Sequence, residues 1–292
     1  MERADAKPAG GAGMIRKAGA VSLAFALMAQ AVLADPSRVL VIGGTAAEIV
    51  AALGQSGRLV ARDATTTFPP ELMALPDVGY MRALSPEGVL STAPDLILAE
   101  AGAGPVEAVE VIKASGIPYV TVPENFGPDA VAEKIKVVGA ALGQSDAAAT
   151  LTAKVETGLA EARAKAAEVS AKKRVLFVLT MQGGRVTVGG DDTAAEAIIE
   201  LAGGVNAAEG VSGYKTMTDE AILAAAPDVI LMMERAGAMA AKPEDLTVNP
   251  ALAATPAGQA GTIVQMDGLK LLGFGPRTPE AAQDLRRALY GA

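Results

Sequence analysis

The sequence has no cysteine and no histidine among its 292 residues. The absence of cysteine excludes disulfide bonds and thiolate nucleophiles. The absence of histidine excludes Ser-His-Asp triads and histidine-rich metal sites. Most familiar hydrolases and the zinc and manganese binders are therefore excluded. The missing cysteines say little about the compartment, because a chain of this length buries a large core without disulfides.

Basic residues are fewer than acidic ones: 25 lysines and arginines oppose 33 aspartates and glutamates, which leaves a net charge of −8. No dense basic cluster lies in the body of the chain, so nucleic acid is not an expected partner. The G-x-G-x-x-G fingerprint is absent as well. Gly43 and Gly44 lie between an expected strand and an expected helix, but their spacing does not match a dinucleotide cradle. We therefore expect no nucleotide site.

The N-terminal segment has the pattern of a signal peptide. A basic pair, Arg16-Lys17, precedes an apolar run from Ala18 to Ala34 that closes in a cleavage-like Val-Leu-Ala tripeptide. A membrane anchor or a buried helix are the alternatives, but the run is short and rich in small residues. We expect residues 1–34 to be an N-terminal extension and signal peptide, with Met14 as an alternative start, and the protein to be exported.

The body of the chain contains an internal repeat, because the segment Ser85–Leu98 recurs in register as Thr218–Leu231. Each copy begins with a residue suited to cap a helix N-terminus and reaches a proline, Pro94 or Pro227, that ends the helix. A short apolar run without alternation follows each proline. Such runs are typical of parallel strands covered on both faces.

The repeat extends upstream of these helices. An expected strand at Arg38–Ile42, followed by a helix capped by Thr45, matches Arg174–Val178 and the helix that follows Thr193. Between the two copies lies an alanine-rich, charged stretch that favours one or two long helices, broken only at Gly143-Gln-Ser145 and Gly158. We therefore expect an α/β protein with two similar lobes joined by a helical backbone and a ligand in the interlobe cleft. The expected boundaries are 1–34 for the leader, 35–127 for the first lobe, 128–173 for the helical linker and 174–292 for the second lobe.

Candidate ligand-binding residues lie in loops of both lobes. Phe68 closes a threonine-rich loop at the end of an expected strand, a position where α/β sheets bind ligands. Tyr80 and Arg82 precede the first repeated helix, and Tyr214-Lys215 precede the second. Arg82 is suited to pair with a ligand carboxylate. Alternatively, the threonine-rich loop is a polar turn in which Phe68 anchors the chain to the core. Arg82 is alternatively a solvated surface residue without a ligand.

Several motifs resemble the periplasmic haemin-binding proteins of bacterial ABC importers. They are Leu75–Leu90, the loop Asp63–Pro69, Ser212–Lys215 and Gly275–Arg277. The resemblance implies two Rossmann-like lobes joined by a long helix, with one haem, or in some members two, held in the cleft as the transported ligand. It also implies a monomer in the periplasm that delivers its ligand to an inner-membrane ABC permease dimer.

The resemblance further implies that Glu87 and Glu220, one in each lobe, form salt bridges to arginines of the permease. Matching carboxylates on matching lobes would suit a partner with two-fold symmetry. On the sequence alone, each glutamate is equally well explained as a carboxylate favoured by the dipole of a helix N-terminus.

The chain departs from the family in its iron ligands. Phe68 stands where the family usually has a tyrosine whose phenolate ligates ferric haem, and no histidine replaces it. The available substitutes are Met181, Tyr80 and Tyr214. The candidate cations for the haem propionates are Arg82, Lys215, Arg235 and Arg277. A siderophore or a corrinoid is the alternative ligand, because neither requires a tyrosinate.

A different class of function is an enzyme that holds a nucleotide or a sugar in the cleft. The absent fingerprint, the missing histidine and cysteine, and the signal peptide favour a binding protein instead. The chain is therefore predicted not to be an enzyme.

Overall fold

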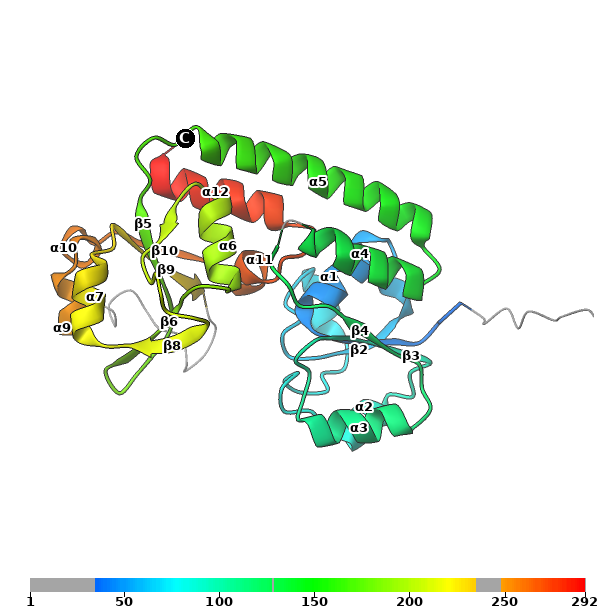
Figure 1. Cartoon of the computed structure of the whole chain (residues 1–292). Coiled ribbons are helices and arrows are strands. Elements are labelled where there is room, and N and C mark those ends of the chain that lie inside the picture. Colours follow the sequence, from blue (N-terminus) through cyan, green and yellow to red (C-terminus); the bar gives the residue numbers. More distant parts are fainter. Residues whose placement is uncertain (1–34, 128, 235–247, 292) are drawn as a thin grey trace, which may run out of the picture. The chain divides into compact units, whose positions relative to one another are not determined.

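The computed structural model describes residues 35–127, 129–234 and 248–291. These residues belong to one compact unit, Asp35–Ala292. Within it the chain forms two α/β lobes, each built around its own sheet, so the predicted fold class is confirmed (Figure 1). None of the helices in the described residues is long and apolar enough to cross a membrane.

The first lobe contains a parallel sheet with the strand order β2-β1-β3-β4. Its strands are β1 (Val39–Ile42), β2 (Leu59–Arg62), β3 (Leu96–Glu100) and β4 (Tyr119–Val122), and its helices are α1 (Gly44–Ala52), α2 (Pro86–Ser91) and α3 (Val106–Ala114). Short 3-10 turns span Ser56–Arg58 and Pro70–Ala74. The strand and helix of the first repeat copy are confirmed.

Both faces of this sheet are buried. Val39 and Val41 of β1 pack in one cluster with α1 and the following helix α4 (Ala130–Ala141), whereas Leu40 and Ile42 pack in another with α2 and α3. All four side chains are fully buried. This two-sided burial explains why the apolar runs in the sequence do not alternate with polar residues.

The second lobe contains a mixed sheet with the order β10-β9-β5-β6-β8, and β7 pairs with the start of β5. Its strands are β5 (Arg174–Gln182), β6 (Arg185–Gly189), β7 (Val205–Asn206), β8 (Tyr214–Met217), β9 (Val229–Glu234) and β10 (Ile263–Asp267). Its helices are α6 (Ala194–Leu201), α7 (Asp219–Ala225), α9 (Pro250–Ala254), α10 (Pro256–Ala260), α11 (Gly268–Leu272) and α12 (Thr278–Tyr290). Strands β5 and β6 form a hairpin, with Gly183 and Gly184 at positive φ in its turn.

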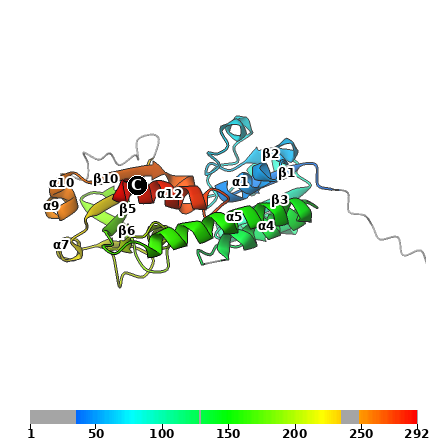
Figure 2. The ribbon, with the colours of Figure 1, turned by 90° about the horizontal axis from the view of Figure 1, so that it is seen from above.

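The 23-residue helix α5 (Ser145–Ala167) follows α4 and lies along α4 and α12 (Figures 1 and 2). Its buried side chains Val155 and Leu159 join a core cluster that contains residues of both lobes. The expected break before α5 is confirmed, but Gly158 was wrongly expected to break the helix. It lies inside α5, where an added Cβ would come 2.8 Å from Cβ of Pro279, so its glycine permits close packing with α12.

The sequence repeat is also a repeat of backbone geometry. Each copy ends its helix with an alanine in the left-handed region, Ala93 at φ 46° and Ala226 at φ 41°. The aspartate two residues later, Asp95, accepts from the backbone amide of Arg38 at 2.9 Å, and Asp228 accepts in the same way from Arg174 at 2.8 Å. Each aspartate therefore fixes the start of the neighbouring parallel strand.

Two of the three predicted caps, Ser85 and Thr218, are confirmed, and Thr193 caps α6 in the same way. The hydroxyls of Ser85, Thr193 and Thr218 accept from the first-turn amides of α2, α6 and α7. Thr45 is the exception, because α1 begins at Gly44 and the Thr45 hydroxyl donates to the carbonyl of Gly273 in the second lobe at 2.9 Å. The repeat therefore breaks where the first lobe meets the second.

We expect Asp95→Asn to weaken the start of β1. Burial of the carboxyl raises its pKa, but hydrogen bonds from Ser37 and Arg38 outweigh this and lower the pKa overall. A lowered folded-state pKa contributes stability above the unfolded value, and this stability is lost as the pH falls through the folded value. Because the carboxyl is largely exposed, we expect a loss of only about 0.5 kcal/mol at neutral pH, measured by urea unfolding. A deficit that persists unchanged at strongly acidic pH would contradict the assignment.

Candidate functional site

The two lobes meet where the segment Gly273–Arg277 of the second lobe packs on α1 and α4 of the first. We call this contact the junction. The Gly273 carbonyl accepts from the Thr45 hydroxyl at 2.9 Å and from Nζ of Lys134 at 3.0 Å. Lys134 comes from α4 and is 2% exposed. Beside it the rings of Phe126 and Phe274 meet edge to face with centroids 5.3 Å apart.

A carboxylate of the protein itself occupies the N-terminus of α1. Oε1 of Glu100, at the end of β3, accepts from the amide of Ala46 at 2.9 Å. The Gly43 and Gly44 amides donate to Asp63 and to the Thr65 hydroxyl, each at 2.9 Å. The backbone amides of the glycine turn and helix start, a kind of place that can hold a phosphate, are therefore occupied by side chains of the protein.

Glu100 and Lys134 carry opposite charges in a desolvated place. Burial raises the pKa of Glu100, against the Ala46 hydrogen bond and the attraction of Lys134. Burial lowers the pKa of Lys134, against the attraction of Glu100 and Glu124. The backbone of Gly43 passes close to this group at φ +111°, where an added Cβ would lie 2.4 Å from the Glu100 carboxyl carbon. Close packing here demands a glycine.

We expect Lys134→Met to destabilise the protein by about 3 kcal/mol at neutral pH, because it leaves a buried carboxylate without its partner. The carboxyl of Glu100 has a raised folded-state pKa, so its protonation below that value relieves the desolvation cost. The deficit should therefore shrink as the pH falls. Urea unfolding at several pH values measures it, and Lys134→Met/Glu100→Gln should recover part of the loss. A deficit that is independent of pH would contradict the coupling.

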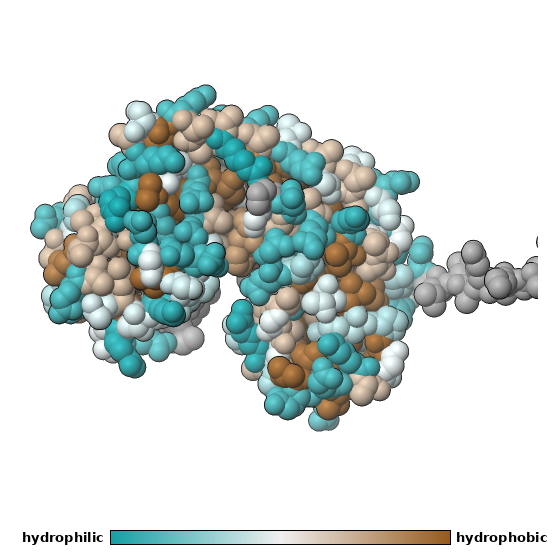
Figure 3. Space-filling model, viewed as in Figure 1, coloured by the Kyte–Doolittle hydropathy of each residue, from teal (hydrophilic) through white to brown (hydrophobic). Residues whose placement is uncertain are grey.

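A pocket of about 450 Å³ lies between the loop after β4 and the start of α6. We call it the cleft pocket. The surface is hollowed between the two lobes in the view of Figure 3. The charged residues that line the cleft pocket are all acidic: Glu124, Asp192, Glu196 and Glu200. Burial raises the pKa of Glu196, and the charges of Glu200, Asp191 and Asp192 raise it further.

Arg82 and Tyr214 approach this region from opposite lobes. An added Cβ at Gly102 would lie 3.3 Å from Oε2 of Glu124 and 3.8 Å from Nη2 of Arg82, so these two side chains lie against the same glycine. Burial raises the pKa of Tyr214, and the charges of Glu124 and Arg82 act on the same phenol with opposite signs. The Tyr214 ring packs edge to face on Phe177 with centroids 6.4 Å apart. Two of the predicted ligand-binding residues are therefore brought into electrostatic range of each other.

Phe68 and Arg277, which are also predicted to bind the ligand, contact each other. The guanidinium carbon of Arg277 lies 3.6 Å from the centroid of the Phe68 ring. Arg277 also donates to the buried carboxylate of Glu48, from Nη2 at 2.9 Å and from its backbone amide at 3.1 Å. This stack joins α1 and the loop after β2 to the second lobe. A ligand-binding role for either residue stays a prediction.

The other candidates are spread over both lobes. Tyr80 is 49% exposed in the turn that also carries Arg82. Lys215 is exposed on β8, and Met181 is half-buried on β5. Arg235 lies outside the described residues. Among the described residues no group of acidic side chains is arranged to hold a metal ion.

The two predicted docking glutamates occupy equivalent positions. Glu87 and Glu220 are exposed and lie in the first turns of α2 and α7. Sequence reasoning missed Glu48, Glu100 and Lys134. Glu100 could have been found, because it lies at the end of a repeated strand. Lys134 could not, because nothing in the alanine-rich sequence around it indicates that it is buried.

Comparison with known proteins places this geometry in a family. The sequence profile of the periplasmic binding proteins matches residues 39–268. A solved structure of the periplasmic haem-binding protein BhuT, in complex with two haems, is 43% identical, has a TM-score of 0.80, and the match covers 86% of this chain and 97% of that chain. The apo form of the periplasmic haem-binding protein RhuT from Roseiflexus sp. RS-1 is 37% identical with a TM-score of 0.84, covering 87% and 98%. The resemblance seen in the sequence is thereby confirmed.

Relatives with other names also match. An uncharacterized ABC transporter substrate-binding lipoprotein of Bacillus subtilis, YvrC, is 26% identical over 88% of this chain and 81% of its own length. The vitamin B12-binding protein of Pectobacterium atrosepticum is 33% identical, but over only 32% of this chain and 34% of its own length. Proteins named for different ligands are therefore similar to this chain.

Proposed function

Since the chain belongs to the periplasmic binding protein family, we propose that it captures haemin in the interlobe cleft and delivers it to an inner-membrane ABC permease. The similarity to haem-binding structures over nearly the whole described chain carries this proposal. The positions of Arg82 and Tyr214, which lie on different lobes within electrostatic range of each other, support it. A signal peptide at residues 1–34 would export the protein to the periplasm, where it would act as a monomer.

Haemin offers an apolar ring and two propionates to such a site. Burial of the porphyrin faces contributes about 25 cal/mol per Å² of apolar area, before the costs of association are subtracted. Arg82 and Lys215, which precede the repeated helices, are suited to pair with the propionates. Arg277 is less available for this role, because Glu48 and the Phe68 ring already hold its guanidinium.

The iron ligand must come from a residue other than Phe68, if the iron is ligated by the protein at all. Burial raises the pKa of Tyr214, although its side chain is still 39% exposed, and a raised pKa opposes the phenolate that ferric haem prefers. Tyr80 is half exposed and lies two residues from Arg82. We therefore favour Tyr80 over Tyr214, with the thioether of Met181 as the third candidate.

The permease contact would use the exposed glutamates of the repeat. Glu87 and Glu220 take the same place in the first turns of α2 and α7, so the two lobes offer the same charge at equivalent positions. A dimeric permease with two-fold symmetry can receive such a pair with the same basic surface on each subunit.

A corrinoid or a siderophore is the alternative ligand. Two observations favour it: Phe68 supplies no phenolate, and the charged lining of the cleft pocket is acidic, which repels propionates. The partial match to vitamin B12-binding proteins points in the same direction.

We expect haemin to bind the protein saturably in an absorbance titration, and Arg82→Ala to weaken binding by about tenfold, because one charge-assisted contact to a propionate is lost. Arg287→Ala, an exposed arginine of α12, serves as the matched control and should bind as the unaltered protein does. Cyanocobalamin is titrated in parallel. Saturable binding of cyanocobalamin, with no haemin binding by folded protein, would replace the haem proposal with the corrinoid one.

The assignment of the iron-ligating residue is tested separately. Tyr80→Phe should change the visible spectrum of the haemin complex, whereas Tyr214→Phe should leave it unchanged. The reverse result would identify Tyr214, in the second lobe, as the iron-ligating residue. Identical spectra for both variants and the unaltered protein would exclude Tyr80 and Tyr214 as the iron ligand and leave Met181→Leu as the next variant to compare.

A further inference from the structure

The turn at Gly102 brings two side chains of opposite charge together. A Cβ added to this glycine would lie 3.3 Å from Oε2 of Glu124, and 3.8 Å from Nη2 and 4.0 Å from Cζ of Arg82. Both side chains are exposed, and within the described part of the chain neither forms a hydrogen bond or an ion pair. We call Glu124 and Arg82 the Gly102 charges. They lie close to each other, and both remain available to a ligand.

Backbone hydrogen bonds hold the segments that carry the Gly102 charges. The Gly104 amide donates to the Met81 carbonyl at 2.8 Å, which binds the loop after β3 to the turn before α2. The Ala101 amide donates to the Val122 carbonyl at 2.8 Å, which binds the same loop to the end of β4. One loop therefore fixes both charged segments relative to each other.

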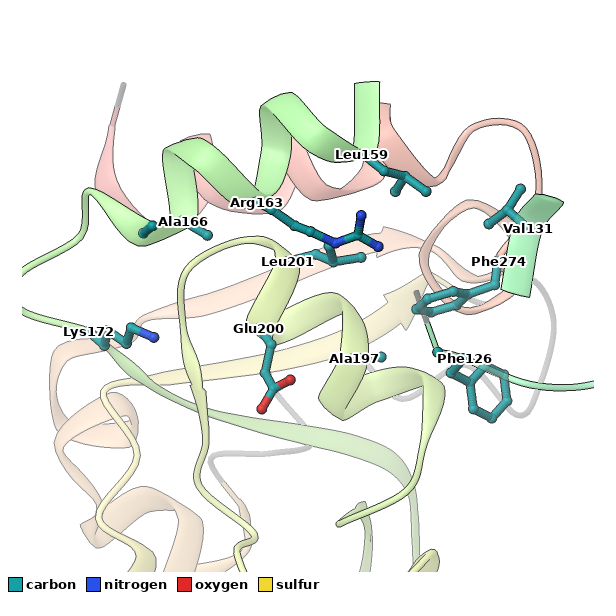
Figure 4. Close-up of a pocket in the computed structure, with 12 residues that line it drawn as sticks. Phe126, Val131, Leu159, Arg163, Ala166, Lys172, Ala197, Glu200, Leu201 and Phe274 are labelled. Atoms are coloured by element: carbon teal, nitrogen blue, oxygen red, sulfur yellow. The ribbon is translucent and has the colours of Figure 1, made fainter. Parts of the chain in front are cut away.

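The loop that carries Glu124 is also anchored on its other side. Asn125 donates from Nδ2 to Oε2 of Glu133 in α4 at 2.6 Å. The Phe126 ring packs edge to face on Phe274, with the ring centroids 5.3 Å apart (Figure 4). The backbone position of Glu124 is therefore fixed from both sides, while its own side chain is exposed and lines the cleft pocket.

The charge of Glu124 also acts on groups other than Arg82. Burial is the main cause that raises the pKa of Tyr214, and the charge of Glu124 adds to this rise while that of Arg82 opposes it. Burial lowers the pKa of Lys134, and the charges of Glu100 and Glu124 oppose this shift. Glu124 is therefore within electrostatic range of a phenol of the second lobe as well as of cations of the first.

A carboxylate beside Arg82 affects which ligands can use this guanidinium. A ligand carboxylate that pairs with Arg82 must come close to the carboxylate of Glu124, and the two like charges repel each other. An uncharged ligand group in the same place meets no such repulsion. The two kinds of ligand therefore differ in what they gain from the same arginine.

We propose that Glu124 is a specificity-determining residue of the cleft, which competes with ligand carboxylates for Arg82. This inference rests on the proposed function, because it requires the ligand to lie beside Arg82. Before haemin binds, Glu124 is the counter-charge of Arg82, and in the complex a propionate takes that place. The competition lowers the affinity for ligands with carboxylates relative to ligands that have the same ring and no charge.

Haemin and its dimethyl ester, which has the same ring and no propionate charge, are titrated by absorbance in the same mixture of water and dimethyl sulfoxide. Glu124→Gln should tighten haemin binding by about fivefold, the usual upper limit for one interaction between exposed charges, and leave binding of the ester unchanged. Glu161→Gln makes the same charge change at an exposed position of α5 and should change neither affinity. No tightening of haemin binding, or equal tightening for both ligands, would overturn the proposal.

A double-mutant cycle shows whether Glu124 acts through Arg82. In Arg82→Ala there is no guanidinium for which a ligand and Glu124 compete. Adding Glu124→Gln to Arg82→Ala should therefore tighten haemin binding by less than about twofold. A tightening as large as the one in the protein with Arg82 would show that Glu124 repels the propionates directly, and the proposed competition would be wrong.

A measurement without ligand separates this inference from the haem proposal. The ionisation of Tyr214 is followed by ultraviolet difference titration, with Tyr214→Phe as the reference. Glu124→Gln should lower the pKa of Tyr214, because a negative charge that disfavours the phenolate is gone, and Arg82→Ala should raise it. An unchanged pKa in Glu124→Gln would overturn the inference whether or not haemin binds. If both shifts occur and the folded protein binds no haemin, the haem proposal fails on its own and the opposition of Glu124 and Arg82 is supported.

Discussion

The carbonyl of Gly273 is the point on which the two-lobed arrangement depends. It accepts from Thr45 of α1 and from the buried ammonium of Lys134, so a single acceptor of the second lobe is bound by two helices of the first. The charge of Lys134 is balanced by Glu100, which in turn closes the N-terminus of α1. The lobes are therefore connected through a polar network in which each buried polar group has its hydrogen-bond or charge partner inside the network.

This network also explains the position of the candidate site. The loops that follow β3 and β4 carry Gly102 and Glu124, and the junction holds them opposite the second lobe, where Tyr214 packs on Phe177. Arg82 reaches the same region from the turn before α2. The repeated lobes provide similar frames, while the side chains proposed to bind the ligand come from the turn before α2, at Arg82, and from the start of β8, at Tyr214. Glu87 and Glu220 nevertheless keep equivalent positions in the first turns of α2 and α7.

Much of the fold could be predicted because its signals are local. The caps at Ser85 and Thr218, the prolines that end the repeated helices, and the apolar strands all act within a few residues of their own position. Thr45 and Gly158 were misread because their partners, Gly273 and Pro279, lie far away in the sequence. The same limit hid the stack of Phe68 on Arg277, since each residue looked like a ligand contact when considered alone.

We expect the junction to fix the separation of the lobes. Because the chain has no native cysteine, spin labels can be attached at Glu110→Cys on α3 and Ala224→Cys on α7, both exposed. Double electron–electron resonance should give one narrow distance distribution that shifts by less than about 2 Å with diamagnetic gallium protoporphyrin and broadens in Lys134→Met. A broad or bimodal distribution in the protein with an unaltered junction would contradict the account.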